Sequence, residues 1–434
     1  MCSLLRMNKY RWMFCLLTVL GLFAALPTSV IADTVELADG TEVTVTIDPA
    51  EGNDLLIWLP SEAGPQEGDE QIAERLAALG VTVWRADLLE ARFLPLLPSS
   101  LEQLPASDVA RLIAQAERQT NKRIFIAATG RTAIPVLRGV RQWQGDNPDS
   151  RRFGGAVLIS PKLFVETPDP GEAAEIMPIV MASNLPIFVL QPEKSPWYWK
   201  LGMTIPALEK GGSDVMVQVI RQVRDRYFFR SNAVELEHQE TARLPKRLVE
   251  AMRFLAAMPD KARQPVALSV PQPAPRTEKK ERQLKPYGGD PMPPALSLRD
   301  LDGRQVSLAD FHGRVVLVNF WASWCPPCVK EMPSMQRLAD RLASQPFVIL
   351  GVNMAEEKTV VTDFLDQFEA DAVAVRFPIL FDSDGAALKR WQVFAFPTSY
   401  VVDKQGKIRY AMFGATEWDG GDILDVLQSL LAEQ

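Results

Sequence analysis

Two cysteines separated by two residues are the side chains of this chain best suited to chemistry. Cys325 and Cys328 flank Pro326 and Pro327, shortly after an apolar stretch. A Cys-x-x-Cys pair can close a disulfide within one helical turn, and the pKa of such cysteines is often lowered to roughly 3.5–7.5. The pair predicts thiol–disulfide exchange, with Cys325 as the attacking thiol and Cys328 as the resolving thiol.

Two other uses of this pair are a zinc site and a structural disulfide. Zinc would need two further Cys or His ligands, and His238 and His312 lie far apart in the sequence. A structural disulfide that closes so short a loop would constrain the unfolded chain little. Both remain weaker hypotheses than exchange, and no metal or other cofactor is expected besides the redox-active disulfide itself.

A strand and a helix should position the two cysteines. Val315–Phe320 is a continuous apolar run, typical of a buried strand, and a helix is expected over about Pro327–Leu342. Cys325 would then lie where the helix begins, and the free N–H groups and dipole of a helix start favour thiolate over thiol. Cys328, one turn inside the helix, should be shielded, whereas Cys325 should be open to solvent.

Strand-like and helix-like patterns alternate through the rest of the C-terminal part. A hairpin is expected over Leu296–Leu308, turning at Asp302-Gly303. The further strands expected are Phe347–Val352, Ser399–Val402 and Ile408–Phe413, and the further helices are Val360–Phe368, Ala386–Trp391 and Asp422–Leu431.

These residues resemble those of a known family. Val318–Cys328 reads Val-Asn-Phe-Trp-Ala-Ser-Trp-Cys-Pro-Pro-Cys, Glu331 and Pro333 follow, and Phe396-Pro397-Thr398-Ser399 forms a matching downstream turn. About the last third of the chain is similar to the TlpA/ResA/CcmG (DsbE) family of disulfide reductases. The resemblance implies a thioredoxin-like fold, a central mixed sheet with flanking helices. The segment around Val373–Phe381 suits this family's central insertion.

The resemblance also implies roles for single residues. Pro397 should be a cis-proline facing the cysteines, the alternative being an ordinary trans proline, and Phe396 should offer its backbone to the client, the disulfide-bearing protein. Glu331 should tune thiol protonation, the alternative being a solvated helix glutamate. The other residues expected to bind the client are Trp324, Pro326, Pro327 and Thr398.

One position departs from thioredoxin itself. Asn319, six residues before Cys325, stands where thioredoxin has a buried Asp. Because an amide cannot exchange protons at neutral pH, proton movement would fall to Glu331 or to water. The resemblance further implies re-reduction by a membrane electron donor of the DsbD/CcdA type.

Composition and the N-terminus indicate an exported globular protein. The 434 residues carry a formal net charge of −7, with no basic patch for nucleic acid. Three basic residues and an apolar run from about Trp12 to Leu26 read as a signal peptide, residues 1–32, cleaved before Asp33; an uncleaved anchor is the alternative. Cleavage would leave two of the four cysteines, Cys325 and Cys328, as suits the periplasm.

A proline-rich, charged stretch divides the remaining chain. Residues 259–292 contain several prolines and the run Glu278–Arg282, which resist burial and predict an extended linker. Residues 33–258 and 293–434 should be separate α/β domains. In the first, a hairpin over Val35–Ile47 precedes alternating segments. The strands expected are Leu55–Leu59, Val81–Arg85, Ile124–Ala128, Ala156–Ile159, Ile187–Leu190 and Val215–Ile220, and the helices are Ile72–Leu79 and Asp108–Gln119.

The N-terminal domain weakly resembles an α/β-hydrolase. Strand Ile124–Ala128 leads into Thr129-Gly130-Arg131-Thr132 and then a helix, where the nucleophile elbow would lie. Gly130 stands at the nucleophile position and has no side chain to attack with. His238, the available base, lies in a charged run and is interpreted as a surface residue. The domain is therefore expected to bind or position rather than hydrolyse.

Three hypotheses follow for the whole chain. The first is a disulfide reductase of periplasmic proteins with a recognition domain attached. The second is a hydrolase with an accessory redox domain, which Gly130 speaks against. The third is a non-catalytic scaffold, which the intact Cys-Pro-Pro-Cys motif, Glu331 and Pro397 speak against.

Overall fold

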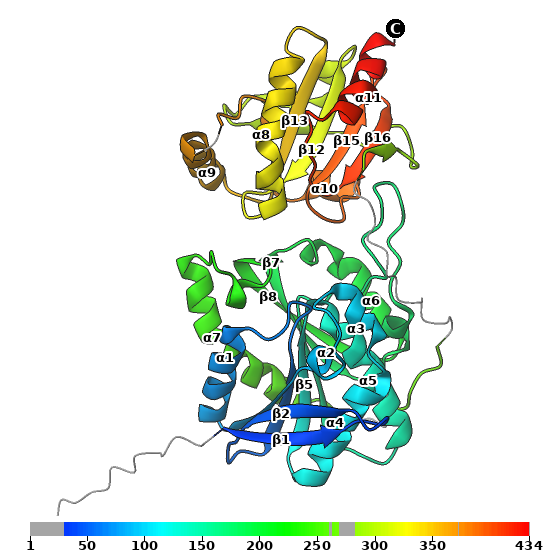
Figure 1. Ribbon diagram of the computed structural model, residues 1–434, viewed down its shortest axis with the longest axis vertical. Helices are drawn as coiled ribbons and strands as arrows, with labels where there is room; N and C mark the ends of the chain where they lie inside the picture. Colours follow the sequence, from blue (N-terminus) through cyan, green and yellow to red (C-terminus); the bar gives the residue numbers. More distant parts are fainter. Residues whose placement is uncertain (1–29, 260–262, 269–282, 372, 434) are drawn as a thin grey trace, which may run out of the picture.

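The computed structural model describes residues 30–259, 263–268, 283–371 and 373–433, which form two α/β domains in tandem (Figure 1). The predicted signal segment, residues 1–32, lies almost wholly outside the described residues, as does much of the predicted linker. Within the part of the chain that the structure describes, no helix is both long and apolar enough to span a bilayer.

One eight-stranded sheet forms the centre of the N-terminal domain, in the order β1-β2-β4-β3-β5-β6-β7-β8. The strands from β4 to β8 in that order are parallel, and β1 and β2 form the antiparallel hairpin predicted over Val35–Ile47. The strands are β1 (Ile31–Glu36), β2 (Glu42–Asp48), β3 (Asp54–Leu59), β4 (Val81–Ala86), β5 (Arg123–Thr129), β6 (Phe153–Ile159), β7 (Pro186–Lys194) and β8 (Asp214–Arg224).

Helices cover both faces of this sheet, which confirms the predicted layered α/β class (Figure 1). They are α1 (Glu67–Ala78), α2 (Leu88–Ala91), α3 (Pro98–Gln103), α4 (Ala106–Gln119), α5 (Ala133–Asp146), α6 (Leu201–Lys210) and α7 (Glu235–Ala256). α1 and α7 pack on one face, and α4, α5 and α6 pack on the other. The sequence analysis did not anticipate α7, because its charged first turns hide the buried row Leu244, Leu248 and Met252. The closer likeness to a hydrolase stays a prediction.

The C-terminal domain has a mixed eight-stranded sheet in the order β11-β10-β14-β13-β12-β15-β16-β9. β12 lies at its centre, parallel to β13 and antiparallel to β15. The strands are β9 (Lys285–Pro286), β10 (Ser297–Asp300), β11 (Gln305–Ser307), β12 (Val315–Trp321), β13 (Phe347–Met354), β14 (Ile379–Asp382), β15 (Thr398–Val402) and β16 (Ile408–Phe413).

Four helices flank this sheet, and the arrangement is thioredoxin-like, as predicted. They are α8 (Pro326–Arg341), α9 (Lys358–Asp371), α10 (Ala386–Arg390) and α11 (Gly421–Ala432). α8 and α11 bury apolar side chains on one face of the sheet, and α10 does so on the other. The C-terminal end of the insertion expected around Val373–Phe381 forms the start of β14.

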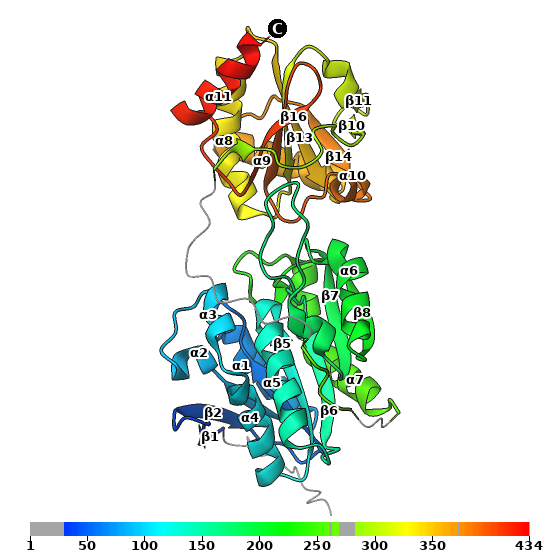
Figure 2. The same ribbon diagram turned by 90° about the vertical axis from the view of Figure 1, so that its right-hand side faces the viewer.

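The C-terminal domain begins before the predicted boundary at residue 293. Lys285–Pro286 forms the edge strand β9, which pairs with β16, and the ring of Tyr287 lies 5.9 Å from that of Tyr400. The prediction of an extended linker up to residue 292 was therefore wrong at its C-terminal end, because an edge strand tolerates a proline. The loop after β6 reaches this edge (Figure 2), where Lys285 pairs with Asp169 at 3.4 Å.

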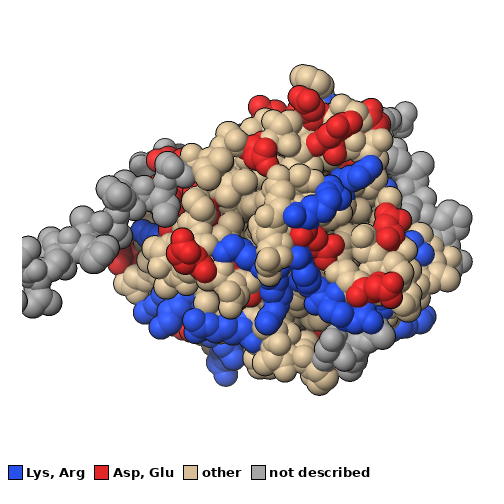
Figure 3. Space-filling model, turned by 90° about the horizontal axis from the view of Figure 1, so that it is seen from below, with Lys and Arg blue, Asp and Glu red and all other residues tan. Residues whose placement is uncertain are grey.

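The carboxyl ends of the parallel strands in both domains meet at the junction between the domains (Figure 1). The opposite face of the N-terminal domain carries many Lys and Arg side chains (Figure 3). A pocket of about 240 Å³ lies at this opposite end, lined by Arg123, Arg151 and Arg263 among others. The redox motif therefore faces the N-terminal domain, far from this basic face.

Candidate active site

β12 and α8 position the cysteine pair. All seven residues of β12 are buried, and the strand ends at Trp321. Cys325 is the N-cap of α8, and its sulfur accepts a hydrogen bond from the backbone N–H of Cys328 at 3.4 Å. Pro326 and Pro327 fill the first two helical positions, where a missing N–H costs nothing. The start of α8 therefore directs the N–H of Cys328 toward the sulfur of Cys325, while the N–H of Val329 donates to the carbonyl of Cys325 at 3.1 Å.

The two cysteines form a disulfide, with their Cα atoms 5.3 Å apart. Cys328 is fully buried, as expected for a shielded resolving thiol, but Cys325 is only 6% exposed. The expectation that Cys325 is open to solvent was therefore wrong. Its side chain lies in one apolar cluster with the rings of Trp324 and Phe396.

Pro397 follows a cis peptide bond, as the resemblance implied, so the trans alternative is wrong. The ring of Phe396, before it, lies 5.9 Å from that of Trp324 in an edge-to-face arrangement. Thr398 is buried, and its hydroxyl donates to the carbonyl of Ala395 at 2.7 Å. The structure thus brings Trp324 and Phe396 together beside the disulfide. It leaves Pro326 and Pro327 exposed and occupies Thr398 with the turn itself.

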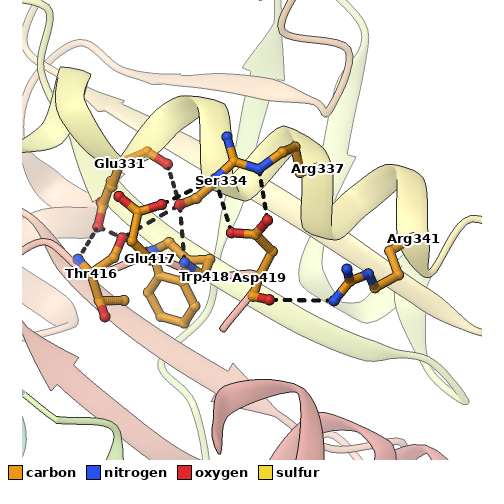
Figure 4. Close-up of polar contacts among 8 residues, drawn as sticks. All are labelled: Glu331, Ser334, Arg337, Arg341, Thr416, Glu417, Trp418 and Asp419. Atoms are coloured by element: carbon orange, nitrogen blue, oxygen red, sulfur yellow. Dashed lines mark hydrogen bonds and ion pairs between the residues drawn. The ribbon is translucent and has the colours of Figure 1, made fainter. Parts of the chain in front are cut away.

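Glu331 points from α8 toward the segment that contains Thr416 and Trp418 (Figure 4). It is 1% exposed, so the alternative of a solvated helix glutamate is wrong. Its carboxylate accepts hydrogen bonds from the Nδ2 of Asn319 at 2.8 Å, from the Nε1 of Trp418 at 3.0 Å and from the N–H of Thr416 at 3.4 Å. None of these donors is a cation.

Burial without a cation raises the pKa of Glu331 from 4.5 to about 7, although the three donors pull it down. A carboxyl group with a pKa near neutral can give up and take back a proton at working pH. Glu331 lies three residues after Cys328, which is one turn along α8. This geometry suits proton exchange with the resolving thiol.

Glu356 is a site residue that the sequence analysis missed. Its carboxylate accepts from the N–H of Ser323 at 2.7 Å, from the hydroxyl of Ser323 at 2.5 Å and from the Nδ2 of Asn353 at 2.8 Å. It therefore fixes the loop that leads into Cys325. The available signal was its position just after β13, because carboxyl ends of neighbouring parallel strands meet at one edge of a sheet.

The candidate hydrolase site in the N-terminal domain is filled by a carboxylate. Gly130 follows β5 with a φ of +62°, and a side chain there would bring its Cβ to 2.7 Å from the Oε2 of Glu62. Glu62 is buried and pairs with Lys162 at 2.6 Å and Arg226 at 2.5 Å. These cations lower the pKa of Glu62 to about 2 against the opposing effect of burial, which is the largest single influence. His238 is exposed on α7, as interpreted from the sequence.

Comparison with known proteins places the C-terminal part. The sequence pattern of the AhpC/TSA family matches residues 289–411. The thiol-disulfide oxidoreductase ResA of Geobacillus thermodenitrificans is 36% identical over 137 residues, which cover 32% of this chain and 75% of that protein. The chain belongs to the ResA family of thiol-disulfide oxidoreductases.

The ResA-like part is a minority of the chain. ResA of Bacillus thuringiensis subsp. konkukian is 35% identical over 115 residues, which span 26% of this chain and 64% of that relative's length. The crystal structure of StoA from Bacillus subtilis matches 29% of this chain and 92% of its own, at 29% identity and a TM-score of 0.26, a score too low to carry weight. The AhpC/TSA pattern lies within the C-terminal domain, apart from the N-terminal domain.

Proposed function

We propose that this chain reduces disulfides of client proteins outside the cytoplasm, through Cys325 and Cys328. The observation that carries the proposal is the Cys325–Cys328 disulfide at the start of α8 with Glu331 buried one turn beyond it. The apolar run near the N-terminus and a mature chain with one cysteine pair favour an exported protein.

The exchange runs in two displacement steps. In the reduced protein the Cys325 thiolate attacks one sulfur of the client disulfide, and the other client sulfur leaves as a thiolate and takes up a proton. Cys328, having lost its proton, then attacks the sulfur of Cys325. The Cys325–Cys328 disulfide forms, and the second client sulfur leaves reduced. Glu331 is positioned to take the proton of Cys328.

A reductant must then restore the two thiols. The proposed donor is a membrane protein of the DsbD/CcdA type, and the proposed clients are exported proteins with accessible disulfides. The direction of exchange is testable as a reduction potential against glutathione. A potential near about −120 mV, as in strong oxidants, would contradict a reducing role.

Hydrolysis is not proposed for the N-terminal domain, because Glu62 fills the space that a side chain at position 130 would need. The test of the proposed function is insulin-disulfide reduction by the full chain. We expect wild type to reduce insulin and Cys325→Ala to be inactive. Equal activity in the two proteins, or none in the wild type, would refute the proposal.

A further inference from the structure

The N-terminal domain contacts the redox loop directly. Arg230, which follows β8 and the short 3-10 turn η4 (Tyr227–Phe229), donates from a guanidinium nitrogen to the backbone carbonyl of Trp324 at 3.3 Å. The peptide unit that carries this carbonyl also carries the N–H of Cys325. A positive charge from one domain therefore lies one peptide unit from the attacking cysteine of the other.

Several aromatic and polar contacts hold the two domains in this arrangement. Phe394, three residues before Pro397, packs against Phe164 and Trp197 of the N-terminal domain, with ring centroids 4.8 and 5.8 Å apart. Lys200 donates to the carbonyl of Val393 at 3.1 Å, and its ammonium lies 4.7 Å from the Phe394 ring. The same contacts bury Lys200 and lower its pKa to about 8.

No carboxylate is hydrogen-bonded to Arg230 in the part of the chain that the structure describes, although the charges of Asp225 and Glu237 act on it. Its other hydrogen bonds go to the Oδ1 of Asn232 and the backbone carbonyl of Asp225, both at 3.2 Å. Among the described residues it forms no ion pair, whereas its neighbours Arg224 and Arg226 pair with Glu237 and Glu62. Half-burial accordingly lowers the pKa of Arg230. The positive charge of Arg230 is therefore only partly offset, and it can act on a nearby anion.

Few other charges face Cys325. On α8, Glu331 is buried one turn beyond Cys328, and Lys330 is exposed. After β13, Glu356 is held by Ser323 and Asn353. The segment from Trp391 to Ser399 contains no charged residue. Beyond β16, Glu417 and Asp419 pair with Arg337. Among the described residues, Arg230 is thus a cation without an ion pair that contacts the redox loop directly, and the neighbouring carboxylates oppose ionisation of Cys325.

We propose that the N-terminal domain supplies Arg230 as a positioning residue that stabilises the Cys325 thiolate while the two domains are docked. The inference rests on the proposed exchange at Cys325 and gives the N-terminal domain a part in it. An opposite charge at close range favours the ionised form of a group, typically by one or more pKa units. The reduced, ionised state of the pair is therefore favoured by a residue from outside the thioredoxin-like fold.

The test is the pH dependence of iodoacetamide alkylation at Cys325 in the reduced full chain, followed by mass spectrometry of the Cys325 peptide. In Arg230→Gln we expect the apparent pKa of Cys325 to rise by about one unit. The reduction potential should fall by about 30 mV, the equivalent of a tenfold change in the exchange equilibrium. Arg230→Lys keeps the charge and should stay near wild type. The matched control is Arg243→Gln, which removes an exposed cation of the same domain that pairs with Glu240.

An unchanged apparent pKa in Arg230→Gln, or equal shifts in Arg230→Gln and Arg230→Lys, would overturn the inference. If Arg230→Gln fails to fold, the variant Ser231→Glu tests the same inference. It places a carboxylate at an exposed position beside Arg230 and should raise the apparent pKa of Cys325 relative to Ser231→Gln. No difference between the two would overturn the inference. Insulin reduction by the wild type distinguishes failure of the proposed function from failure of the role of Arg230. If the wild type does not reduce insulin, the proposed function fails. If it does, the variants test only the role of Arg230.

Discussion

The side-chain amide of Asn319 donates a 2.8 Å hydrogen bond to the carboxylate of Glu331, joining the central strand β12 to the helix that begins at the redox pair. Asn319 also donates to the hydroxyl of Ser399 at 2.9 Å. Asn319, whose side-chain amide cannot exchange protons at neutral pH, thus orients the carboxyl group of Glu331, which can. In the proposed mechanism the acid–base role falls to Glu331, one turn past the cysteines.

The first prediction concerns Glu331→Gln and pH. The folded protein raises the pKa of Glu331 to about 7, so it binds this proton more tightly than the unfolded chain does. Stability from this group is present below about pH 4.5 and is lost as pH rises through 7. Relative to the variant, wild type should lose up to about 3 kcal/mol of unfolding free energy over that range. Denaturant unfolding of both oxidised proteins across pH measures this.

The control for this experiment is Glu417→Gln, a neutralisation at an exposed carboxylate of the segment that contains Thr416 and Trp418. Its stability difference from wild type should show no comparable loss as the pH rises from 4.5 to 7. Parallel pH curves for wild type and Glu331→Gln would show that position 331 does not titrate in this range.

The second prediction is a covalent trap. Cys328→Ala removes the resolving thiol, so a mixed disulfide between Cys325 and a client cannot be released by internal attack. Expressed in the proposed location outside the cytoplasm, this variant should accumulate client proteins that a reducing agent sets free. The Cys325→Ala variant, matched in size and expression, should accumulate none. An empty trap would count against a reducing role.

The third prediction tests the loop before Cys325. Glu356→Ala removes the acceptor of both Ser323 hydrogen bonds and leaves buried donors unpaired, which should destabilise the C-terminal domain by about 2 kcal/mol. Hydrogen exchange at the Ser323 amide should become faster. Glu357→Ala, at the exposed neighbouring position, is the control and should change neither. If the two variants behave alike, Glu356 does not hold the loop.

The fourth prediction concerns the filled hydrolase position. Gly130→Ser should destabilise the N-terminal domain by about 2 kcal/mol more than Gly40→Ser, and should gain no esterase activity. Both glycines have positive φ, +62° and +84°, but a Cβ at position 40 meets no atom within 4 Å, whereas at 130 it meets Glu62. The difference between the two variants therefore isolates the clash. Equal destabilisation of the two variants would show that the side chain of Glu62 moves aside without a cost in stability.

Local patterns were enough to predict the elements that carry the cysteines. Val315–Phe320 and Pro327–Leu342 match β12 and α8 within a residue or so, because a continuous apolar run and a proline at a helix start are local signals. The helix α7 escaped the sequence analysis because its apolar row begins only after two charged turns. Strand β9 was not predicted, because it forms by pairing with β16, a partner more than 100 residues away in the sequence.

The candidate site could be predicted from the sequence only where its residues belong to a recognisable motif. Glu331 was predicted from the resemblance, at its place three residues after Cys328, whereas its hydrogen-bond donors Thr416 and Trp418 come from a segment 85 and 87 residues away. Contacts of that kind depend on tertiary packing. The contact from Arg230 to the carbonyl of Trp324 likewise arises from the docking of two domains, which no periodicity encodes.

The most direct test of the account is the ionisation of Cys325 itself. In the reduced full chain, the rate of iodoacetamide alkylation at this cysteine is measured across mildly acidic pH, with a free model thiol measured in parallel. The account predicts a half-maximal rate at a pH well below about 8.5, the ordinary pKa of a cysteine thiol. An alkylation rate that follows the free thiol at every pH would contradict it.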